Sequence, residues 1–295
     1  MPTQPPFNHN PQKRLLLFGA GGKLGTALRK AFGPDHQLFF KDSRTLDVRD
    51  TVQVRRYVEE IAPDLVINAA AYVGIDACEQ HPETALAINT LFPKELARLS
   101  NQMGFVLAQI STDAVFDSCK EDYYDEADCP RPVNVYGLSK YGADCLVAAI
   151  AQRCYIFRIP LLFGPNPRNN QFVEKMLARI RDGAAELRIS SDIITSPSYS
   201  YDIAQAIRTI TETGTAFGTY HIANQGTASL LDLMNQLIKN LKLDVKITGC
   251  PHTAFPSLGI KNTYTPLRSG KLESLRPWQE ALESYCREIK HEVMA

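Results

Sequence analysis

A glycine-rich turn near the start of the chain constrains the fold more than any other feature. The apolar run 13–18 ends directly in the pattern Gly19-x-x-Gly22-x-x-Gly25, and apolar residues then repeat at helical spacing up to Gly33-Pro34. A β-carbon at such glycines would block the tight turn and the approach of a pyrophosphate to the helix N-terminus. The strand, the turn and the helix together predict the first unit of a dinucleotide-binding fold.

Strands and helices are expected to alternate through the first half of the chain. Apolar runs read as buried strands, and amphipathic stretches as helices, in the segments 37–41, 52–61, 65–68, 83–102, 105–111 and 154–162. Pro93 is expected to kink the helix 83–102. The alternation predicts an α/β fold, Rossmann-like, with a doubly wound parallel sheet and a ligand site at the C-terminal ends of the strands.

Beyond residue 165 the regular alternation fails, and a smaller C-terminal substrate-binding region is expected. Its predicted elements are helices at 172–181, 201–211, 230–241 and 278–288, strands at 186–190 and 218–222, and an extended segment at 196–201. The strand 218–222 is expected to return to the sheet. We predict a disordered tail at 1–12, a dinucleotide-binding domain at 13–165 with return segment 200–224, and a substrate-binding domain at 166–199 and 225–295.

Composition excludes several classes of function. The chain of 295 residues has 32 Lys+Arg and 32 Asp+Glu, so a zero net charge gives no reason to expect nucleic acid or a membrane surface as partner. No apolar run reaches the length of a membrane span, and the tail lacks the apolar core of a signal peptide. The seven cysteines form no CxxC pair and the six histidines no cluster, which predicts no metal site and free thiols in a reducing cytoplasm.

A tyrosine and a lysine one helical turn apart suggest the chemistry. Tyr136 and Lys140 stand at i and i+4 where a helix begins, and the strand 105–111 leads into Thr112. When hydride is delivered to a ketone, the carbonyl oxygen gains negative charge and must be protonated. Tyr136 is expected to donate that proton, Lys140 to lower the tyrosine's pKa from ~10, and Thr112 to hold the carbonyl. These three are the predicted catalytic residues.

A larger set of residues is predicted to bind the cofactor. Asp42 lies at the distance from the glycines where an acid holds a ribose 2′-hydroxyl, whereas Ser43 and Arg44 beside it would suit a 2′-phosphate. The residues alone leave NAD and NADP open, and Asn89 is either a cofactor contact or a helix-face amide. The predicted set is Gly19, Gly22, Lys23, Leu24, Asp42, Ser43, Arg44, Asp47, Ala69, Ala70, Ala71, Asn89, Lys140 and Pro160.

These residues resemble the extended short-chain dehydrogenase/reductase superfamily and, within it, the dTDP-4-dehydrorhamnose reductase family. The similarity extends from about Arg14 to Glu283. Its motifs are Asn68-Ala69-Ala70-Ala71-Tyr72 with Asp76 and Glu79, Ser111-Thr112-Asp113 with Val115-Phe116-Asp117, Asn134-Val135-Tyr136-Gly137 with Ser139-Lys140, Ser196-Pro197-Ser198-Tyr199 with Asp202, and Trp278-Gln279-Glu280-Ala281-Leu282. The resemblance implies Thr112, Tyr136 and Lys140 as the catalytic trio. It also implies reduction of a 4-keto-6-deoxy sugar on a nucleotide, with NADPH, or alternatively NADH, as hydride donor.

The chain departs from the family pattern where the sugar nucleotide should bind. Ala114 and Leu161 stand where the family usually has tyrosine and tryptophan, and Ile193 replaces a glutamine. Loss of aromatic and polar surface is expected to retune sugar binding. The predicted substrate-side residues are Asp113, Ala114, Leu161 and Tyr199. Ala27 stands where some members carry the acid of a metal-bridged dimer, and a homodimer remains an open alternative.

Two other functions are compatible with the same residues. One is an epimerase or dehydratase of sugar nucleotides, which would keep NAD bound through its cycle. The other is a non-catalytic regulatory subunit, because the regulatory subunit of methionine adenosyltransferase resembles this family and has a strand similar to Phe157-Arg158-Ile159-Pro160. An acidic, turn-rich segment at 117–131 is either a cover over the site or a solvated loop.

Overall fold

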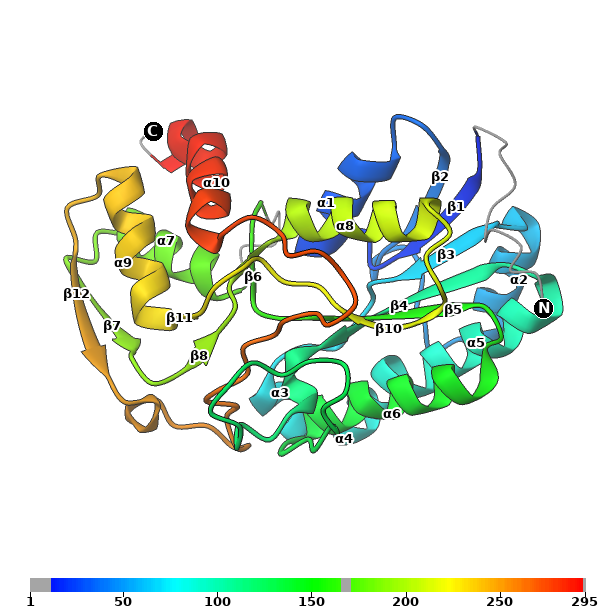
Figure 1. The fold of residues 1–295 in the computed structure, drawn as a ribbon, viewed down its shortest axis with the longest axis horizontal. Helices are drawn as coiled ribbons and strands as arrows, with labels where there is room; N and C mark the ends of the chain where they lie inside the picture. Colours follow the sequence, from blue (N-terminus) through cyan, green and yellow to red (C-terminus); the bar gives the residue numbers. More distant parts are fainter. Residues whose placement is uncertain (1–11, 166–170, 294–295) are drawn as a thin grey trace.

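In the computed structural model, which describes residues 12–165 and 171–293, six parallel strands form the central sheet (Figure 1). In spatial order they are β10 (Gly218–His221), β5 (Cys154–Ile159), β4 (Val106–Thr112), β3 (Leu65–Asn68), β1 (Arg14–Phe18) and β2 (Gln37–Lys41). The predicted parallel Rossmann-like sheet is confirmed. The segment expected to return from the second half of the chain joins it, with β10 pairing alongside β5.

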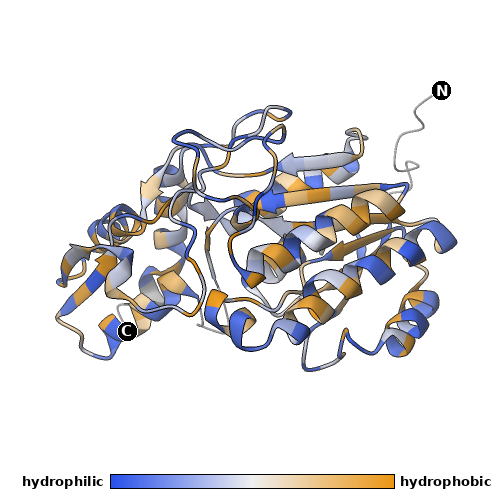
Figure 2. Ribbon diagram, turned by 90° about the horizontal axis from the view of Figure 1, so that it is seen from below, coloured by the Kyte–Doolittle hydropathy of each residue, from blue (hydrophilic) through white to orange (hydrophobic). Residues whose placement is uncertain are grey.

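Helices cover both faces of this sheet. One face carries α1 (Lys23–Phe32) and α8 (Ser200–Glu212), and the other carries α2 (Thr51–Ile61), α5 (Phe92–Met103) and α6 (Val135–Ile150) (Figure 1). Leu15 and Leu17 enter the core under α1 and α8, whereas Leu16 and Phe18 enter the opposite core. Burial on both faces explains why the strands read as continuous apolar runs. The helices are apolar on the side toward the sheet and polar outside (Figure 2).

A second region packs against one end of the sheet around its own core. Its helices are α7 (Phe172–Arg181), α9 (Leu230–Leu241) and α10 (Trp278–Val293). Its strands form the pairs β7 (Glu186–Ser190) with β12 (Lys246–Cys250), β8 (Ile194–Thr195) with β11 (Ala228–Ser229), and β6 (Leu162–Phe163) with β9 (Ser198–Tyr199). The sequence predicts no strand at β12. This strand is half-exposed and contains a glycine, so it depends on its pairing with β7.

Two predicted elements are divided at prolines. The expected helix 83–102 consists of α4 (Pro82–Leu86), a π-helical turn η1 (Ala87–Leu91) and α5, preceded by a short α3 (Ile75–Gln80). Pro93 has no N–H, and the N–H of Phe92 bonds five residues back to Ala87, so the helix is interrupted by a π turn next to the proline at which a kink was expected. The expected strand 154–162 divides into β5 and β6 at Pro160 for the same reason.

The remaining predictions concern boundaries and the chain's tail. Short 3₁₀ turns η2 (Asp113–Val115) and η3 (His252–Ala254) follow β4 and β12. The predicted final helix 278–288 extends to Val293 in α10. The predicted disordered tail 1–12 lies, apart from Gln12, outside the described residues.

Candidate active site

A cavity of about 690 Å³ opens where the strands of the central sheet end. Because all six strands are parallel, their C-terminal ends meet at one edge, and residues that follow β1, β2, β3, β4 and β5 line this space. Of the predicted site residues, those that line it are Gly19, Gly22, Lys23, Leu24, Asp42, Ser43, Asp47, Ala69, Ala70, Ala71, Thr112, Tyr136, Lys140 and Pro160.

The glycine turn leaves room for a ligand group at the N-terminus of α1. Gly19 has a φ of +80°, and a β-carbon there would come within 2.4 Å of the carbonyl carbon of Ala69. A β-carbon at Gly25 would come within 2.2 Å of the carbonyl oxygen of Gly19. Gly22, at the N-cap of α1, has no side chain with which to cap the helix. The N–H groups of the first turn therefore remain available to an anion such as a pyrophosphate.

Lys23 connects this turn to the second region of the protein. Its Nζ donates to the carbonyl oxygen of Leu162 at 2.7 Å and lies 2.9 Å from Oε1 of Glu174 on α7. Burial lowers the pKa of Lys23, while Glu174 acts in the opposite direction. Lys23 therefore lines the cavity and also forms a buried ion pair, a partner that the sequence did not indicate.

Two arginine–aspartate pairs follow the end of β2, and Asp42, Asp47 and Arg49 of these pairs line the cavity. Oδ2 of Asp42 accepts from Nη2 of Arg44 at 2.7 Å and from Nε at 3.2 Å. Asp47 and Arg49 form a similar pair, with Nη2 and Oδ2 2.7 Å apart, and this pair lowers the pKa of Asp47. The Arg44 side chain is 82% exposed and lies outside the cavity wall, where it neutralises the carboxylate of Asp42.

Tyr136 and Lys140 line the cavity together from the first turns of α6. Asn134 caps this helix, since its side chain accepts from the N–H of Gly137 at 2.8 Å. Nζ of the buried Lys140 donates to the carbonyl oxygen of Ile110 at 2.6 Å. Burial lowers the pKa of Lys140 to about 8, against the attraction of Asp144.

The pKa of Tyr136 differs in direction from the expectation. Lys140 was expected to lower it, but burial raises the pKa of Tyr136 to about 12, with the hydroxyl of Thr112 acting in the opposite direction. The physical reason is that the ammonium of Lys140 is directed at a backbone carbonyl, so desolvation of the phenolate dominates. At neutral pH Tyr136 is therefore a neutral phenol with a proton to donate.

Thr112 ends β4 and is tied to its neighbour Asp113. Oγ1 of Thr112 donates to Oδ1 of Asp113 at 3.0 Å and accepts from the N–H of Ala114 at 3.2 Å. Oδ2 of Asp113 accepts from the hydroxyls of Thr265 at 2.8 Å and Thr195 at 3.3 Å. Burial raises the pKa of Asp113. Asp113, which the sequence predicts as a substrate contact, joins Thr112 to Thr195 and Thr265 of the second region in this structure.

Other predicted residues lie behind the cavity wall. Asn89 is buried, and its amide bonds the N–H and carbonyl of Tyr72 at 2.8 and 2.9 Å, so it holds a residue that does line the cavity. The hydroxyl of Tyr199 donates to Glu288 at 2.6 Å inside the second core, against which Leu161 also packs. Ala114 is buried in η2. Thus none of the four predicted substrate-side residues lines this cavity.

Sequence reasoning missed several residues of the cavity wall. Tyr72, Val73, Thr84 and Ile88 approach from the segments after β3 and in α4–η1, and Gln171 approaches from the start of α7. Tyr72 belongs to a quoted motif, but no pattern distinguishes the other side chains from ordinary helix and loop residues. Arg49 had a signal, because it stands two residues after the predicted cofactor residue Asp47.

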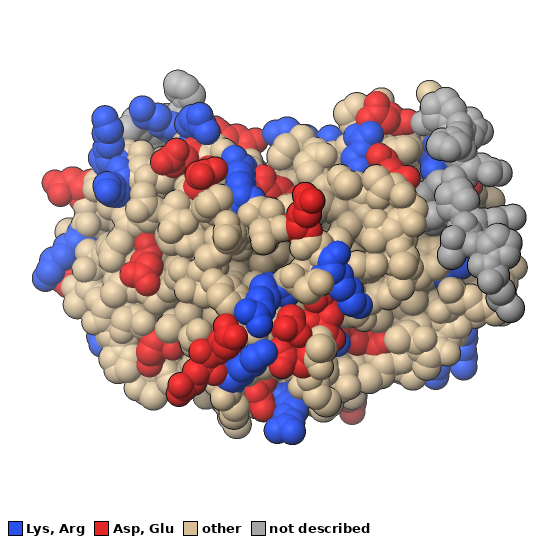
Figure 3. All heavy atoms as spheres, viewed as in Figure 1, with Lys and Arg blue, Asp and Glu red and all other residues tan. Residues whose placement is uncertain are grey.

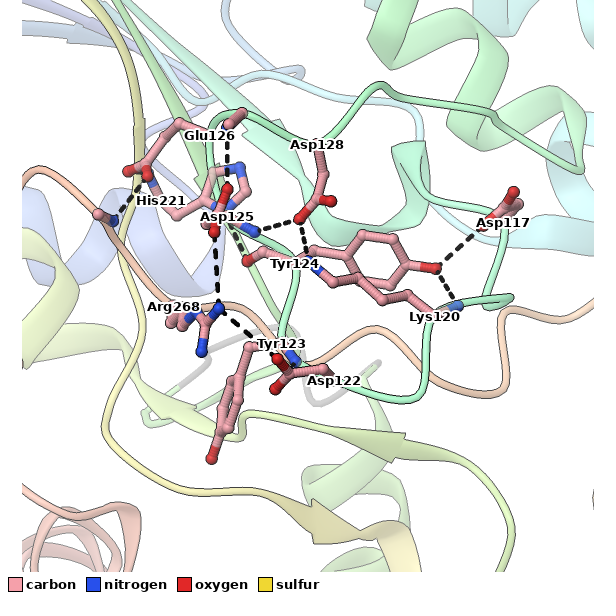
Figure 4. Close-up of polar contacts among 12 residues, drawn as sticks. Asp117, Lys120, Asp122, Tyr123, Tyr124, Asp125, Glu126, Asp128, His221 and Arg268 are labelled. Carbon is pink, nitrogen blue, oxygen red and sulfur yellow. Dashed lines mark hydrogen bonds and ion pairs between the residues drawn. The ribbon is translucent and has the colours of Figure 1, made fainter.

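The acidic segment 117–131 is fastened to its surroundings by polar contacts (Figure 4). The hydroxyl of Tyr124 donates to Asp117 at 3.0 Å, and Glu126 accepts from the N–H of His221 at 2.7 Å. Arg268 lies between Asp122 at 3.6 Å and Asp125 at 3.7 Å. The segment therefore covers the end of β10, and five of its acidic side chains have partners within the protein, namely Asp117, Asp122, Asp125, Glu126 and Asp128.

The described residues offer no site for a metal ion. Within 12–165 and 171–293, no three His, Cys, Asp or Glu side chains gather closely enough to hold one. Ala27, at the position of the dimer-bridging acid, is buried against α8. No helix in these ranges is long and apolar enough to span a membrane. Figure 3 shows basic and acidic side chains interspersed over the face that it draws, without a field of one sign.

The doubly wound sheet, the glycine turn and the Thr112, Tyr136 and Lys140 side chains around one cavity define an extended short-chain dehydrogenase/reductase. A model of the RmlD substrate binding domain matches residues 13–291. A dTDP-4-dehydrorhamnose reductase of Mycolicibacterium smegmatis is 32% identical over 92% of this chain and 84% of its own length. The chain therefore belongs to the dTDP-4-dehydrorhamnose reductase family.

Other relatives agree with this assignment. The spore coat polysaccharide biosynthesis protein SpsK of Bacillus subtilis is 30% identical over 93% of this chain and 97% of its own. Among solved structures, the dTDP-4-dehydrorhamnose reductase of Bacillus anthracis in complex with NADP matches with a TM-score of 0.88 and 29% identity. That match covers 94% of this chain and 99% of the other.

Proposed function

We propose that this protein is an NADPH-dependent reductase of a nucleotide-linked 4-keto-6-deoxy sugar. The observation that carries the proposal is that Thr112, Tyr136 and Lys140 line the same cavity as the glycine turn. The names of the matched relatives and the NADP complex of one of them support the sugar and the cofactor.

The residues present fit a nicotinamide dinucleotide. Spaces that a β-carbon would fill at Gly19 and Gly25 leave room for the pyrophosphate, and Ala69, Ala70 and Ala71 let the cofactor lie close to the end of β3. Asp42 and Arg44 would hold the adenosine ribose and its 2′-phosphate. When bound, the cofactor supplies the hydride that the ketone carbon receives.

In the reaction, side chains of the protein donate a proton to the carbonyl oxygen and stabilise the negative charge that develops. Tyr136 has a pKa of about 12, so it still carries its phenolic proton at neutral pH before the reaction. As the carbonyl oxygen gains negative charge, Tyr136 donates this proton to it. Protonated Lys140 stabilises the phenolate that is left, and Thr112 donates a hydrogen bond to the same oxygen. To do so, the Thr112 proton turns away from Asp113, to which it is directed in this structure.

Replacing Arg44 with alanine is expected to shift the cofactor preference. We expect KM for NADPH to rise about tenfold, since a charge-assisted contact to phosphate contributes roughly 1.4 kcal/mol, while KM for NADH changes less than about twofold. Initial rates with both cofactors measure the effect. Arg188→Ala, which removes an exposed side chain on β7, is the control and should change neither constant. An equal rise for both cofactors would remove Arg44 from phosphate recognition.

The function itself is tested by incubating the purified protein with NADPH and dTDP-4-dehydrorhamnose. We expect oxidation of added NADPH matched by one equivalent of reduced sugar nucleotide. An epimerase or dehydratase would instead carry bound NAD after purification and consume none that is added. A regulatory subunit would bind cofactor without turnover and copurify with another protein, and either of these results would refute the proposal.

We further propose a reducing cytoplasm as the protein's compartment and leave a homodimer as a hypothesis about its assembly. All seven cysteines are free, and Cys119, Cys129 and Cys145 among them are exposed, an arrangement that oxidation would threaten outside a reducing compartment. Cell fractionation would test the compartment, and a protein found outside the cytoplasm would refute it. Light scattering on the purified protein gives the mass, and a monomer would exclude the homodimer.

A further inference from the structure

A buried ion pair lies directly behind the catalytic lysine. Oδ2 of Asp144 on α6 accepts from Nε of Arg158 on β5 at 3.0 Å, and the two side chains are only 4% and 7% exposed. Neither residue lines the cavity. The mechanism above assigns no role to the pair, although Asp144 acts electrostatically on Lys140.

The fold brings four polar residues together at this point. Lys140 and Asp144 are separated by four residues, so they lie on one face of α6 about one turn apart. Ser111 and Arg158 are paired in the register of β4 and β5, so their side chains leave the sheet on the same side. Arg158 donates to the carboxylate of Asp144, and Ser111 beside it lowers the pKa of that carboxyl.

The surrounding groups favour an ionised Asp144 beside a protonated Lys140. Burial raises the pKa of Asp144, but Arg158, Ser111 and Lys140 all act to lower it. The guanidinium of Arg158 is fixed over the ring of Phe116, 5.5 Å from its centre. On β10, burial lowers the pKa of His221 to about 4 and raises that of Tyr220, so both side chains are neutral at pH 7.

The groups around Tyr136 do not take the place of the negative charge of Asp144 beside Lys140. Tyr136 itself is a neutral phenol at pH 7, and Asp113 acts on Tyr136 from η2. Both oxygens of Asp113 are occupied by the hydroxyls of Thr112, Thr195 and Thr265. The attraction that opposes the desolvation of Lys140 comes from Asp144.

We propose that Asp144 is a positioning residue that keeps Lys140 protonated in its buried site, with Arg158 holding the carboxylate in place. Its effect on turnover rests on the proposed reductase function, whereas its effect on the charge of Lys140 does not. Without Asp144, the desolvated lysine would lose its proton at a lower pH. Lys140 could then no longer stabilise the phenolate of Tyr136.

The charge of Lys140 is measured directly by NMR titration of ¹³Cε-labelled lysines in the full chain, with the Lys140 signal assigned by its loss in Lys140→Met. In the native protein we expect a midpoint near 8, and in Asp144→Asn a midpoint lower by about one pH unit or more. Asp144→Glu retains the charge and should restore the native midpoint. An unchanged midpoint in Asp144→Asn would overturn the proposal.

The same variants are assayed for kcat/KM against pH. Because protonated Lys140 is the active form, the loss of activity on the alkaline side should move to lower pH in Asp144→Asn by the same amount as the NMR midpoint. If Asp144→Asn fails to fold because Arg158 is left unpaired, Asp144→Asn/Arg158→Met removes the whole pair and should still lower the midpoint, by less than Asp144→Asn because the repulsion of Lys140 by the guanidinium is removed as well. A shifted NMR midpoint in a protein without reductase activity would refute the proposed function and leave this inference standing. A native midpoint in the folded double variant would refute the inference alone.

Discussion

Replacing Tyr136 with phenylalanine is expected to lower kcat about a thousandfold, with KM within about threefold of the native value. The side chain keeps its ring and its place in the cavity wall, but the oxyanion loses its proton donor. The loss corresponds to roughly 4 kcal/mol of transition-state stabilisation. Initial rates of NADPH oxidation with dTDP-4-dehydrorhamnose measure it.

Tyr141→Phe is the matched control for this prediction. Tyr141 lies on the same helix, is half-buried, and does not line the cavity, so its variant should retain native kcat. If Tyr136→Phe turned over at the native rate, another group would be the proton donor. If both variants lost activity equally, the effect would belong to the packing of α6 and not to the phenol.

Replacing Lys23 with methionine is expected to lower the free energy of unfolding by about 3–5 kcal/mol, because Glu174 would remain as an unpaired buried charge. The Lys23 and Glu174 side chains are 1% and 4% exposed. Urea denaturation followed by circular dichroism measures the change. Lys30→Met is the control, since its pair with Glu288 on the surface contributes at most about 1 kcal/mol.

The double variant Lys23→Met/Glu174→Met separates the charge from the packing. Two apolar side chains of similar volume leave no unpaired charge, so most of the lost stability should return. If Lys23→Met were no more destabilising than Lys30→Met, the pair would not fasten the glycine turn to α7. The same result would leave Lys23 free to contact the cofactor, as the sequence predicts.

Local periodicity was sufficient to predict the central sheet and the position of the cofactor turn. β1 and β3 are continuous apolar runs because both faces of the sheet are covered, and Gly19 follows β1 directly. The Tyr136 and Lys140 pair was also predictable, because four residues is one helical turn. These features depend on residues close in sequence, and the family resemblance that rests on them is confirmed.

The features that could not be predicted depend on contacts between distant segments. β12 exists through its pairing with β7, about 60 residues earlier in the chain. The orientation of the Asp113 carboxylate is set by hydrogen bonds from Thr195 and Thr265. Both threonines lie far from β4 in the sequence, so no local pattern predicts these contacts. The raised pKa of Tyr136 likewise reflects how deeply α6 packs at the end of the sheet. The depth at which a side chain is buried cannot be predicted from the pattern of residue types alone.

The departures from the family pattern lie in the second region or at its contact with the sheet. Leu161 and Ile193 both pack against the core that holds Tyr199, and Ala114 is buried beside Gly137. None of these three side chains lines the cavity, whereas Tyr136 and Lys140 both do. We therefore expect KM for the sugar nucleotide, and not the catalytic residues, to differ between this protein and its relatives.

The most direct test of the account is the transfer of deuterium from NADPH labelled with deuterium at the nicotinamide C4 position on the transferred face. The purified protein is incubated with this cofactor and dTDP-4-dehydrorhamnose, and the sugar nucleotide product is analysed by mass spectrometry and NMR. The account predicts one deuterium at C4 of the product sugar, and no transfer with Tyr136→Phe within the time of the native reaction. A product without deuterium, or labelled cofactor that stays unoxidised, would contradict it.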